Sequence, residues 1–160
     1  MGCDIHCYIE YREKDSGRWR DFGGRINPGR NYAVFERMAG VRGDTAMFEP
    51  RGLPENISHA SQNDSRLYIT NDGAGDDECS KENADRWIKS GCSKLVDEKW
   101  VTNPDWHSHS WLTAQELESA VDAAQDKYGQ SAQEYRAIIA AMRCFEELGY
   151  VSRVVFWFDN

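Results

Sequence analysis

Several features that would place a chain of this size in a familiar class are missing from the sequence. No apolar run approaches the ~18 residues that a membrane span requires, and polar residues at positions 4, 6 and 10 interrupt any apolar segment that could act as a secretory signal. The five cysteines are an odd number with no C-x-x-C pair, which disfavours a disulfide framework and a zinc knuckle. We therefore expect a soluble protein of a reducing cytoplasm, without a membrane partner.

Common catalytic signatures are missing as well. The sequence has no G-x-x-x-x-G-K-[ST] phosphate loop, no G-x-G-x-x-G after a strand and no G-x-S-x-G nucleophile elbow, so the common nucleotide-dependent enzymes and serine hydrolases are not expected. The formal net charge is -8 and no basic stripe is visible, which argues against duplex DNA as a partner. An acidic chain can meet a basic partner or mimic nucleic acid, but the same charge also keeps a small protein soluble.

What the sequence does contain indicates an ordered chain. At 160 residues it is most simply one domain, residues 1–160, with enough length to bury a core. Six tryptophans argue against disorder, although the mean hydropathy is low at -0.74. Residues 41–65 show little periodicity, and loops of that length are usually functional or disordered.

Two helices and two terminal strands are the clearest expected elements. The spacing of a capping box occurs twice, in Thr113 with Glu116 and in Ser131 with Glu134. It predicts helices over 113–129 and 131–149, while β-branched and aromatic residues predict strands over 2–12 and 150–159. Weaker patterns predict helices at 31–40 and 81–91 and strands at 66–70 and 93–101. Together they predict an α+β fold with a mostly antiparallel sheet that includes both terminal strands, and with the two C-terminal helices packed on it.

The opening run MGCDIHCYIE places side chains with chemical potential in one row. Alternate residues of a strand point to opposite faces. One face then carries apolar side chains and the other polar ones: Cys3, Ile5, Cys7 and Ile9 against Asp4, His6, Tyr8 and Glu10. The polar row is either a solvated strand face or the floor of a site. In the second case Asp4 and His6 are the candidate catalytic residues.

A second informative segment is DWHSHSW, residues 105–111, which holds two of the four histidines. In an extended segment the H-x-H spacing projects both imidazoles to the same side, where they could bind one ion. If the strand at 150–159 returns antiparallel beside 2–12, the two ends of the chain bring further carboxylates close. The sequence thus predicts a site for zinc, manganese or a similar divalent ion, with these ligands: Asp4, His6, His107, His109 and Asp159. The alternative is a loop that is anchored by its tryptophans and leaves both histidines in water.

Two arginines beside turn residues are candidate contacts to a substrate. Arg30 in PGRN and Arg51 in PRGLP could each bind a phosphate or carboxylate group through two parallel hydrogen bonds. The alternative for each is a surface position or a salt bridge to a carboxylate of the same chain. Beside a metal-bound water, whose pKa falls to ~7, they would complete a site for hydrolysis.

Two resemblances arise at these residues. The D-I-H of Asp4 and His6 resembles the first D-x-H ligand pair of calcineurin-like metallophosphoesterases. His107 and His109 resemble the final G-H-x-H of that family, with Trp106 in place of the glycine, while the G-D-x-x-D-R and G-N-H-E motifs are absent. Over its whole length the chain more closely resembles a family of small bacteriophage-encoded proteins. The segments that carry this second resemblance are MGCDIH (1–6), RNY (30–32), RGLP (51–54), HSHSWL (107–112) and VFWFDN (155–160).

The phage resemblance implies a role during infection, in the cytoplasm of the infected bacterial host, and it carries no activity with it. Two functions remain open. The first is a divalent-metal-binding protein that acts as a hydrolase of a phosphate-containing small molecule or nucleotide. The alternative is a non-enzymatic counter-defence or regulatory module that binds a host protein or sequesters a signalling nucleotide without metal. Whether the chain is an enzyme is therefore left open by its sequence.

Overall fold

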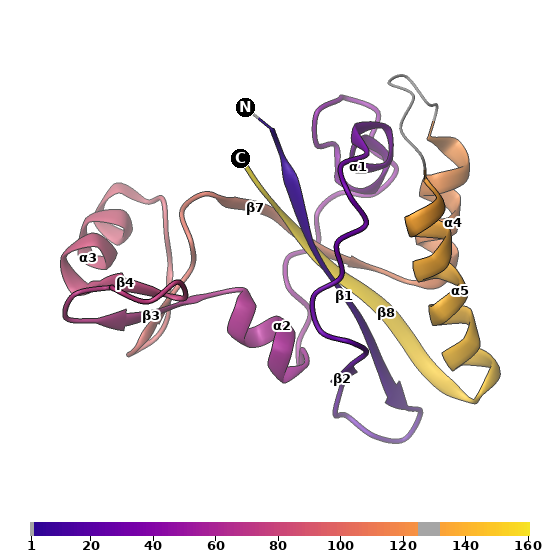
Figure 1. Ribbon diagram of the computed structural model, residues 1–160, viewed down its shortest axis with the longest axis horizontal. Helices are drawn as coiled ribbons and strands as arrows, with labels where there is room; N and C mark the ends of the chain where they lie inside the picture. The colour runs from indigo at the N-terminus through magenta and orange to yellow at the C-terminus, as the bar shows by residue number, and fades with distance from the viewer. Residues whose placement is uncertain (1, 125–131) are drawn as a thin grey trace.

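Two long strands from the two ends of the chain form the centre of the structure, a computed structural model that describes residues 2–124 and 132–160 (Figure 1). β1 (Asp4–Glu13) and β8 (Tyr150–Asp159) pair antiparallel over their full length. β2 (Arg20–Asp21) and β7 (Trp106–Leu112) extend them to a four-stranded sheet of order β2-β1-β8-β7, here called sheet A. The predicted α+β class and the antiparallel pairing of the terminal strands are confirmed.

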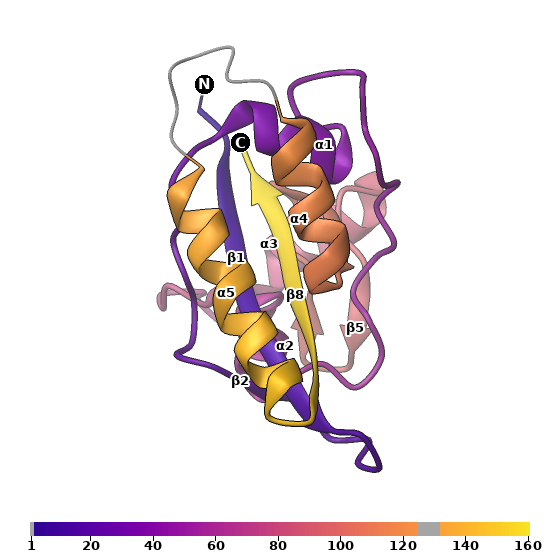
Figure 2. The same ribbon diagram turned by 90° about the vertical axis from the view of Figure 1, so that its right-hand side faces the viewer.

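Three helices cover one face of sheet A, as Figure 2 shows. They are α1 (Tyr32–Ala39), α4 (Ala114–Ala123) and α5 (Gln133–Glu147). The apolar row of β1 lies on this face, as the alternation predicts, and is buried with apolar side chains of the helices and of β8. The buried side chains include Cys3, Ile5, Cys7, Ile9, Phe35, Met38, Leu117, Ile138, Met142, Phe156 and Phe158. Each large apolar side chain in such a core contributes ~1.5–3 kcal/mol of transfer free energy.

The helix ends follow the capping residues of the sequence. Thr113 and Glu116 make both hydrogen bonds of a capping box, so this prediction is confirmed. Asn31 caps α1, and Gly40 ends it in the left-handed conformation with φ 70°, which costs glycine little because it has no Cβ. The second predicted box depends on Ser131, which lies outside the described residues.

A second four-stranded sheet was not expected. It has the order β4-β3-β6-β5 and consists of β3 (Leu67–Thr70), β4 (Glu78–Ser80), β5 (Leu95–Asp97) and β6 (Trp100–Val101). β3 and β4 are parallel, and the run expected as one strand at 93–101 is the hairpin of β5 and β6. With α3 (Lys81–Ser90) this sheet forms the outer lobe, residues 67–101, at the left of Figure 1.

The long loop between α1 and β3 contains one short helix, α2 (His59–Asp64), capped by Ser58. In Figure 1, α2 lies between the outer lobe and sheet A. Two side chains of α2 reach β1: Ser61 contacts Glu10, and Asp64 contacts Tyr8. The loop thus covers part of the face of sheet A that the three long helices leave open. In the described ranges, none of the helices has both the length and the hydropathy of a membrane span.

Candidate functional site

His6 lies on the lobe-facing side of sheet A, between two indole rings. Its ring centroid is 5.0 Å from that of Trp106 and 5.2 Å from that of Trp157, which it stacks against with an interplanar angle of 16°. The side chain is only 6% exposed. The imidazole is therefore fixed by packing, and it faces protein groups rather than open solvent.

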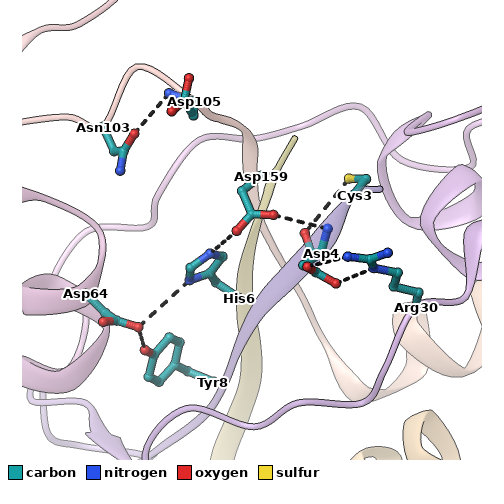
Figure 3. A network of polar contacts seen from close by, with 9 residues as sticks. All are labelled: Cys3, Asp4, His6, Tyr8, Arg30, Asp64, Asn103, Asp105 and Asp159. Carbon is teal, nitrogen blue, oxygen red and sulfur yellow. Dashed lines mark hydrogen bonds and ion pairs between the residues drawn. The ribbon is translucent and has the colours of Figure 1, made fainter. Parts of the chain in front are cut away.

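A chain of polar contacts leads from His6 to the end of sheet A (Figure 3). His6 Nε2 is 2.8 Å from Asp159 Oδ2, and the other oxygen of Asp159 accepts a hydrogen bond from the backbone N–H of Asp4 at 3.2 Å. The carboxylate of Asp4 is held by two hydrogen bonds from Arg30, at 2.5 and 2.8 Å. These bonds, together with the positive charge of Arg30, hold the pKa of Asp4 below its usual value.

The opposite edge of the His6 ring faces α2. His6 Nδ1 is 4.0 Å from Asp64 Oδ2 and forms no hydrogen bond with the described residues. Tyr8 donates its hydroxyl hydrogen to the same carboxylate. The neighbouring His6 and Tyr8 hold the pKa of Asp64 down, while burial and the Asp64 carboxylate raise the pKa of Tyr8. The contact between Tyr8 and Asp64 therefore holds α2 against β1. The carboxylates of Asp64 and Asp159 both have partners within the chain.

The two histidines of the H-x-H segment do not share a side, so that expectation is wrong. The register between β7 and β8 shifts between His107 and Ser110, and Ser108 has a φ of 53°. This β-bulge adds one residue to β7 and so shifts the alternation of its side chains between the two faces of the sheet by one position. His107 stacks on Phe158 on the helix-covered side, with centroids 6.0 Å apart, whereas His109 stacks on Trp157 on the lobe-facing side at 5.7 Å.

The five predicted metal ligands are consequently split between two faces of sheet A. Asp159 and His6 meet, and Asp4 lies beside them, paired with Arg30. His107 is on the opposite face from His6, so their predicted convergence is wrong. Within residues 2–124 and 132–160, no group of three His, Cys, Asp or Glu side chains has the arrangement of a metal site. Metal binding itself stays a prediction.

The two predicted substrate arginines both form ion pairs within the chain. Arg30 binds Asp4, as described above. Arg51 binds Glu116 through two hydrogen bonds, at 3.0 and 2.5 Å, and its guanidinium lies 4.8 Å from the ring centroid of Trp111. Because Glu116 also belongs to the capping box, this pair ties the long loop to the start of α4. The salt-bridge alternative thus describes both arginines in this structure.

A hollow of about 350 Å³, here called the lobe groove, opens beside the His6 network. It lies between the outer lobe, the long loop and β7. Its lining consists of Gly52, Leu53, Gly91, Cys92, Lys94, Thr102, Asn103, Trp106 and His109. The volume lies within the range of small-molecule sites, and the two rings on its floor rest on the buried indole of Trp157.

The polar groups of the lobe groove are mostly hydrogen-bond donors. The side-chain oxygen of Asn103 accepts from the backbone N–H of Asp105 at 3.0 Å, which leaves its amide N–H₂ group to donate. Thr102 Oγ1 accepts from the backbone N–H of Lys94 at 2.9 Å, so its own O–H is a further donor. Lys94 adds an ammonium group. Among the described residues no carboxylate lines the groove, in a chain of net charge -8.

His109 enters the groove as a neutral ring. Burial, and then the nearby His107 and His6, lower its pKa to about 4. At neutral pH it therefore stacks on Trp157 without a positive charge. Sequence reasoning identified His109 but missed Lys94, Thr102 and Asn103, since no motif connects the outer lobe with the H-x-H segment.

The fold and the groove define an α+β protein with a partly aromatic groove on the lobe-facing side of its terminal-strand sheet. Comparison with known proteins adds no closer assignment: no family model, no curated protein and no solved structure matches the chain.

Proposed function

We propose that the chain is a non-catalytic binding module that holds a planar, anionic small molecule of the nucleotide class in the lobe groove. The observation that carries this proposal is the pairing of two accessible rings with a lysine in a lining without carboxylates. In the setting of a phage infection, such a module would sequester a signalling nucleotide.

Stacking supplies the first part of the affinity. Trp106 and His109 both lean on Trp157, so their orientation is fixed before a ligand arrives. Stacking of a base on an aromatic side chain contributes ~1–3 kcal/mol. Because Trp157 is fully buried, the two upper rings are the ones that can meet a base.

Hydrogen bonding supplies the second part. Lys94, Thr102 and Asn103 offer donors, so a ligand rich in acceptors fits them, as the oxygens of a phosphate and the carbonyl edge of a base do. A group with several donors would leave these atoms unpaired, which costs ~1–3 kcal/mol for each buried donor. The donor bias therefore favours phosphorylated ligands over cationic or sugar-only ones.

The His6 network favours binding over hydrolysis. A general base must reach the proton that it removes, and His6 is enclosed by two indoles with Asp159 already on Nε2. The carboxylate of Asp4 is likewise occupied by Arg30. These residues position the floor of the groove instead, because His6 packs directly under Trp106.

Calorimetric titration with AMP, GMP, CMP, UMP and c-di-GMP tests the proposal. We expect saturable binding of at least one nucleotide, which weakens about tenfold or more in Trp106→Leu and weakens in Lys94→Gln. Trp111→Leu and Lys99→Gln are matched controls, because these residues lie outside the lining. Both should retain binding.

Phosphorus NMR of the same mixtures separates binding from turnover. We expect unchanged nucleotide over hours, with and without added zinc or manganese. Steady hydrolysis that depends on metal and on His6 would contradict the proposal and would support the metal-dependent hydrolase instead. Absence of binding for the whole panel at millimolar concentration would contradict it as well.

A further inference from the structure

Another hollow, of about 470 Å³, lies between the loop that joins β1 to β2 and the start of α2. It is here called the hairpin hollow. Its side chains come from Arg18, Trp19, Asn56, Ile57, His59 and Gln62, and it shares no lining residue with the lobe groove. Among the described residues no carboxylate lines it, in a chain with 27 acidic and 19 basic side chains. Such a lining favours an anion as the ligand.

Trp19 turns one face of its indole toward sheet A. The guanidinium carbon of Arg153 lies 3.7 Å from the ring centroid, and that of Arg12 lies 5.1 Å from it. Both arginines are on the lobe-facing side, because Arg153 lies opposite Glu10 and Arg12 follows Glu10 by two residues. The two cations thus reach the ring from the sheet, and the side chain is only partly buried. The indole is held in place and keeps an outer face on which a flat ring can stack.

The surroundings of Trp19 are positively charged. The charge of Arg153 is neutralised by Glu10. Arg12 donates to two backbone carbonyls, those of Lys14 and Ser16. Within the described ranges, neither Arg12 nor the exposed Arg18 forms an ion pair with a carboxylate. Two positive charges therefore remain without a counter-charge in contact, and Arg18 is the one that solvent and a ligand can reach.

An imidazole and two amides add hydrogen-bonding groups to the hollow. Asn63 Nδ2 lies 3.1 Å from His59 Nε2, so Nε2 accepts and Nδ1 carries a proton that it can donate. Asn56 and Gln62 are exposed, and each amide can donate and accept. Amides of this kind bind the edges of nucleobases, as in the pairing of Asn or Gln with adenine. The hollow therefore combines a stacking ring, a free cation and groups that suit a base edge.

The hollow is open to solvent rather than enclosed. Its polar side chains at 18, 56, 59 and 62 are all exposed, whereas a small-molecule site buries about 70–90% of the surface of its ligand. An open site of this kind contacts one or two units of a longer chain and leaves the rest in water. This favours a strand over a free nucleotide.

We propose that the hairpin hollow binds single-stranded nucleic acid, with a base stacked on the outer face of Trp19 and a phosphate paired with Arg18. Stacking on an aromatic ring, together with a cation on the backbone, is the general chemistry of single-strand binding. In a duplex the faces of the bases are stacked on one another and cannot reach Trp19. The site does not depend on the nucleotide proposed for the lobe groove, so either proposal can fail while the other stands.

Fluorescence anisotropy with labelled RNA and DNA strands of about eight nucleotides tests the proposal on the full chain. We expect saturable binding of single strands, at least tenfold tighter than binding of the same sequences as duplexes. Tighter binding of RNA than of DNA would assign a contact to the 2′-hydroxyl, and equal affinities would assign bases and phosphates alone. Equal affinity for duplex and single strand would overturn the proposal, as would no binding of either strand at millimolar concentration.

Variants assign the binding to the hairpin hollow. Trp19→Leu should weaken strand binding about tenfold or more, and Trp19→Phe should recover part of the loss, because a smaller ring still stacks. Arg18→Gln should weaken binding several-fold and reduce the slope of log affinity against log salt by ~0.7. Arg86→Gln changes an exposed arginine of α3 that bonds Asn83. It is the matched control and should bind like the parent chain.

Two outcomes would refute the site. Because Trp19 also covers Arg153, its replacement can lower stability, so Arg18→Gln decides the question with the fold unchanged. Unaltered affinity and salt slope in Arg18→Gln would refute the site. The same holds if Trp106→Leu abolishes strand binding while Trp19→Leu retains it, since the strand would then lie in the lobe groove. Strand binding that depends on Trp19 supports the site even where no mononucleotide binds the chain.

Discussion

The two faces of sheet A differ in chemistry, although the same strands build both. The helix-covered face is a continuous apolar core. The lobe-facing side carries the aromatic pair Tyr8 and Trp157 and a buried ion pair, in which Arg153 donates to Glu10 Oε2 at 2.8 Å. The pleat of the strand assigns alternate residues to the two faces. The helix-covered face therefore supplies most of the apolar core, while the lobe-facing side holds polar networks and the lobe groove.

The buried ion pair should give the largest loss of stability. Glu10 is 0% exposed and also accepts from the backbone N–H of Ser58 and the hydroxyl of Ser61. Arg153→Met leaves its carboxylate buried without its cation, which costs about 3–5 kcal/mol of unfolding free energy. Urea unfolding measures this loss. Arg136→Met, which removes an exposed ion pair with Asp122, is the control and should cost much less. A similar loss of unfolding free energy in the two variants would contradict the larger effect expected of the buried pair.

A cavity in the helix-covered core should be nearly as costly but should not affect ligand binding. Leu117→Ala removes a side chain that is 1% exposed, and such changes cost about 2–5 kcal/mol. The affinity of the lobe groove for nucleotide should remain that of the parent chain at a temperature where both are folded. A loss of affinity in proportion to stability would show that the two faces are not independent.

The neutral state of His109 should make stability depend on pH. Its folded pKa, about 4, is depressed below an unfolded value of ~6.5, so the unfolded chain binds more protons between these values. The contribution of His109 to the free energy of unfolding is fully present above pH ~6.5 and is lost as the pH falls toward 4. It amounts to at most about 3 kcal/mol.

Chemical unfolding at pH 7, 6, 5 and 4.5 measures this slope. His109→Gln should flatten it. His59→Gln is the control. It replaces an imidazole on α2 that hydrogen-bonds Asn63, and it should leave the pH slope of stability unchanged. An equally steep slope in His109→Gln would assign the dependence to other groups.

The smallest expected effect concerns the contact between Tyr8 and α2. Tyr8→Phe keeps the ring under Trp157 and removes the hydroxyl that Asp64 accepts. We expect the free energy of unfolding to fall by about 0.5–1.5 kcal/mol. Amide hydrogen exchange should become faster than in the parent chain, and this acceleration should be larger in α2 than in β1. Unchanged exchange in α2 would show that the helix is held by Ser58 and Ser61 alone.

The terminal strands and the helix layer could be predicted because each depends on a repeated local pattern. Alternation over ten residues assigned the two faces of β1, and the capping box located the start of α4. The sheet of the outer lobe could not be found in this way, although a strand at 66–70 and a helix at 81–91 were expected and correspond to β3 and α3. Its strands are two to four residues long, too short for a period to show, and their pairing depends on contacts between distant segments.

The candidate site was predicted only in part for a related reason. Asp4, His6 and Asp159 were expected together, and the register of β1 and β8 places them together. His107 and His109 were assigned to one side because the spacing assumes a regular strand. Glycine is the residue that usually indicates a positive φ in a sequence. Because Ser108 adopts the positive φ here, the sequence gives no signal of the bulge.

The pairing of Asp4 with Asp159 also has a consequence for synthesis on the ribosome. β1 leaves the ribosome first, yet its principal partner is translated some 140 residues later, at ~5–20 residues per second. For a period on the order of ten seconds the apolar row of β1 therefore has no sheet to join. A circular permutant that links the two neighbouring ends would make β8 and β1 a local hairpin, and would let the central pair form as soon as it is translated.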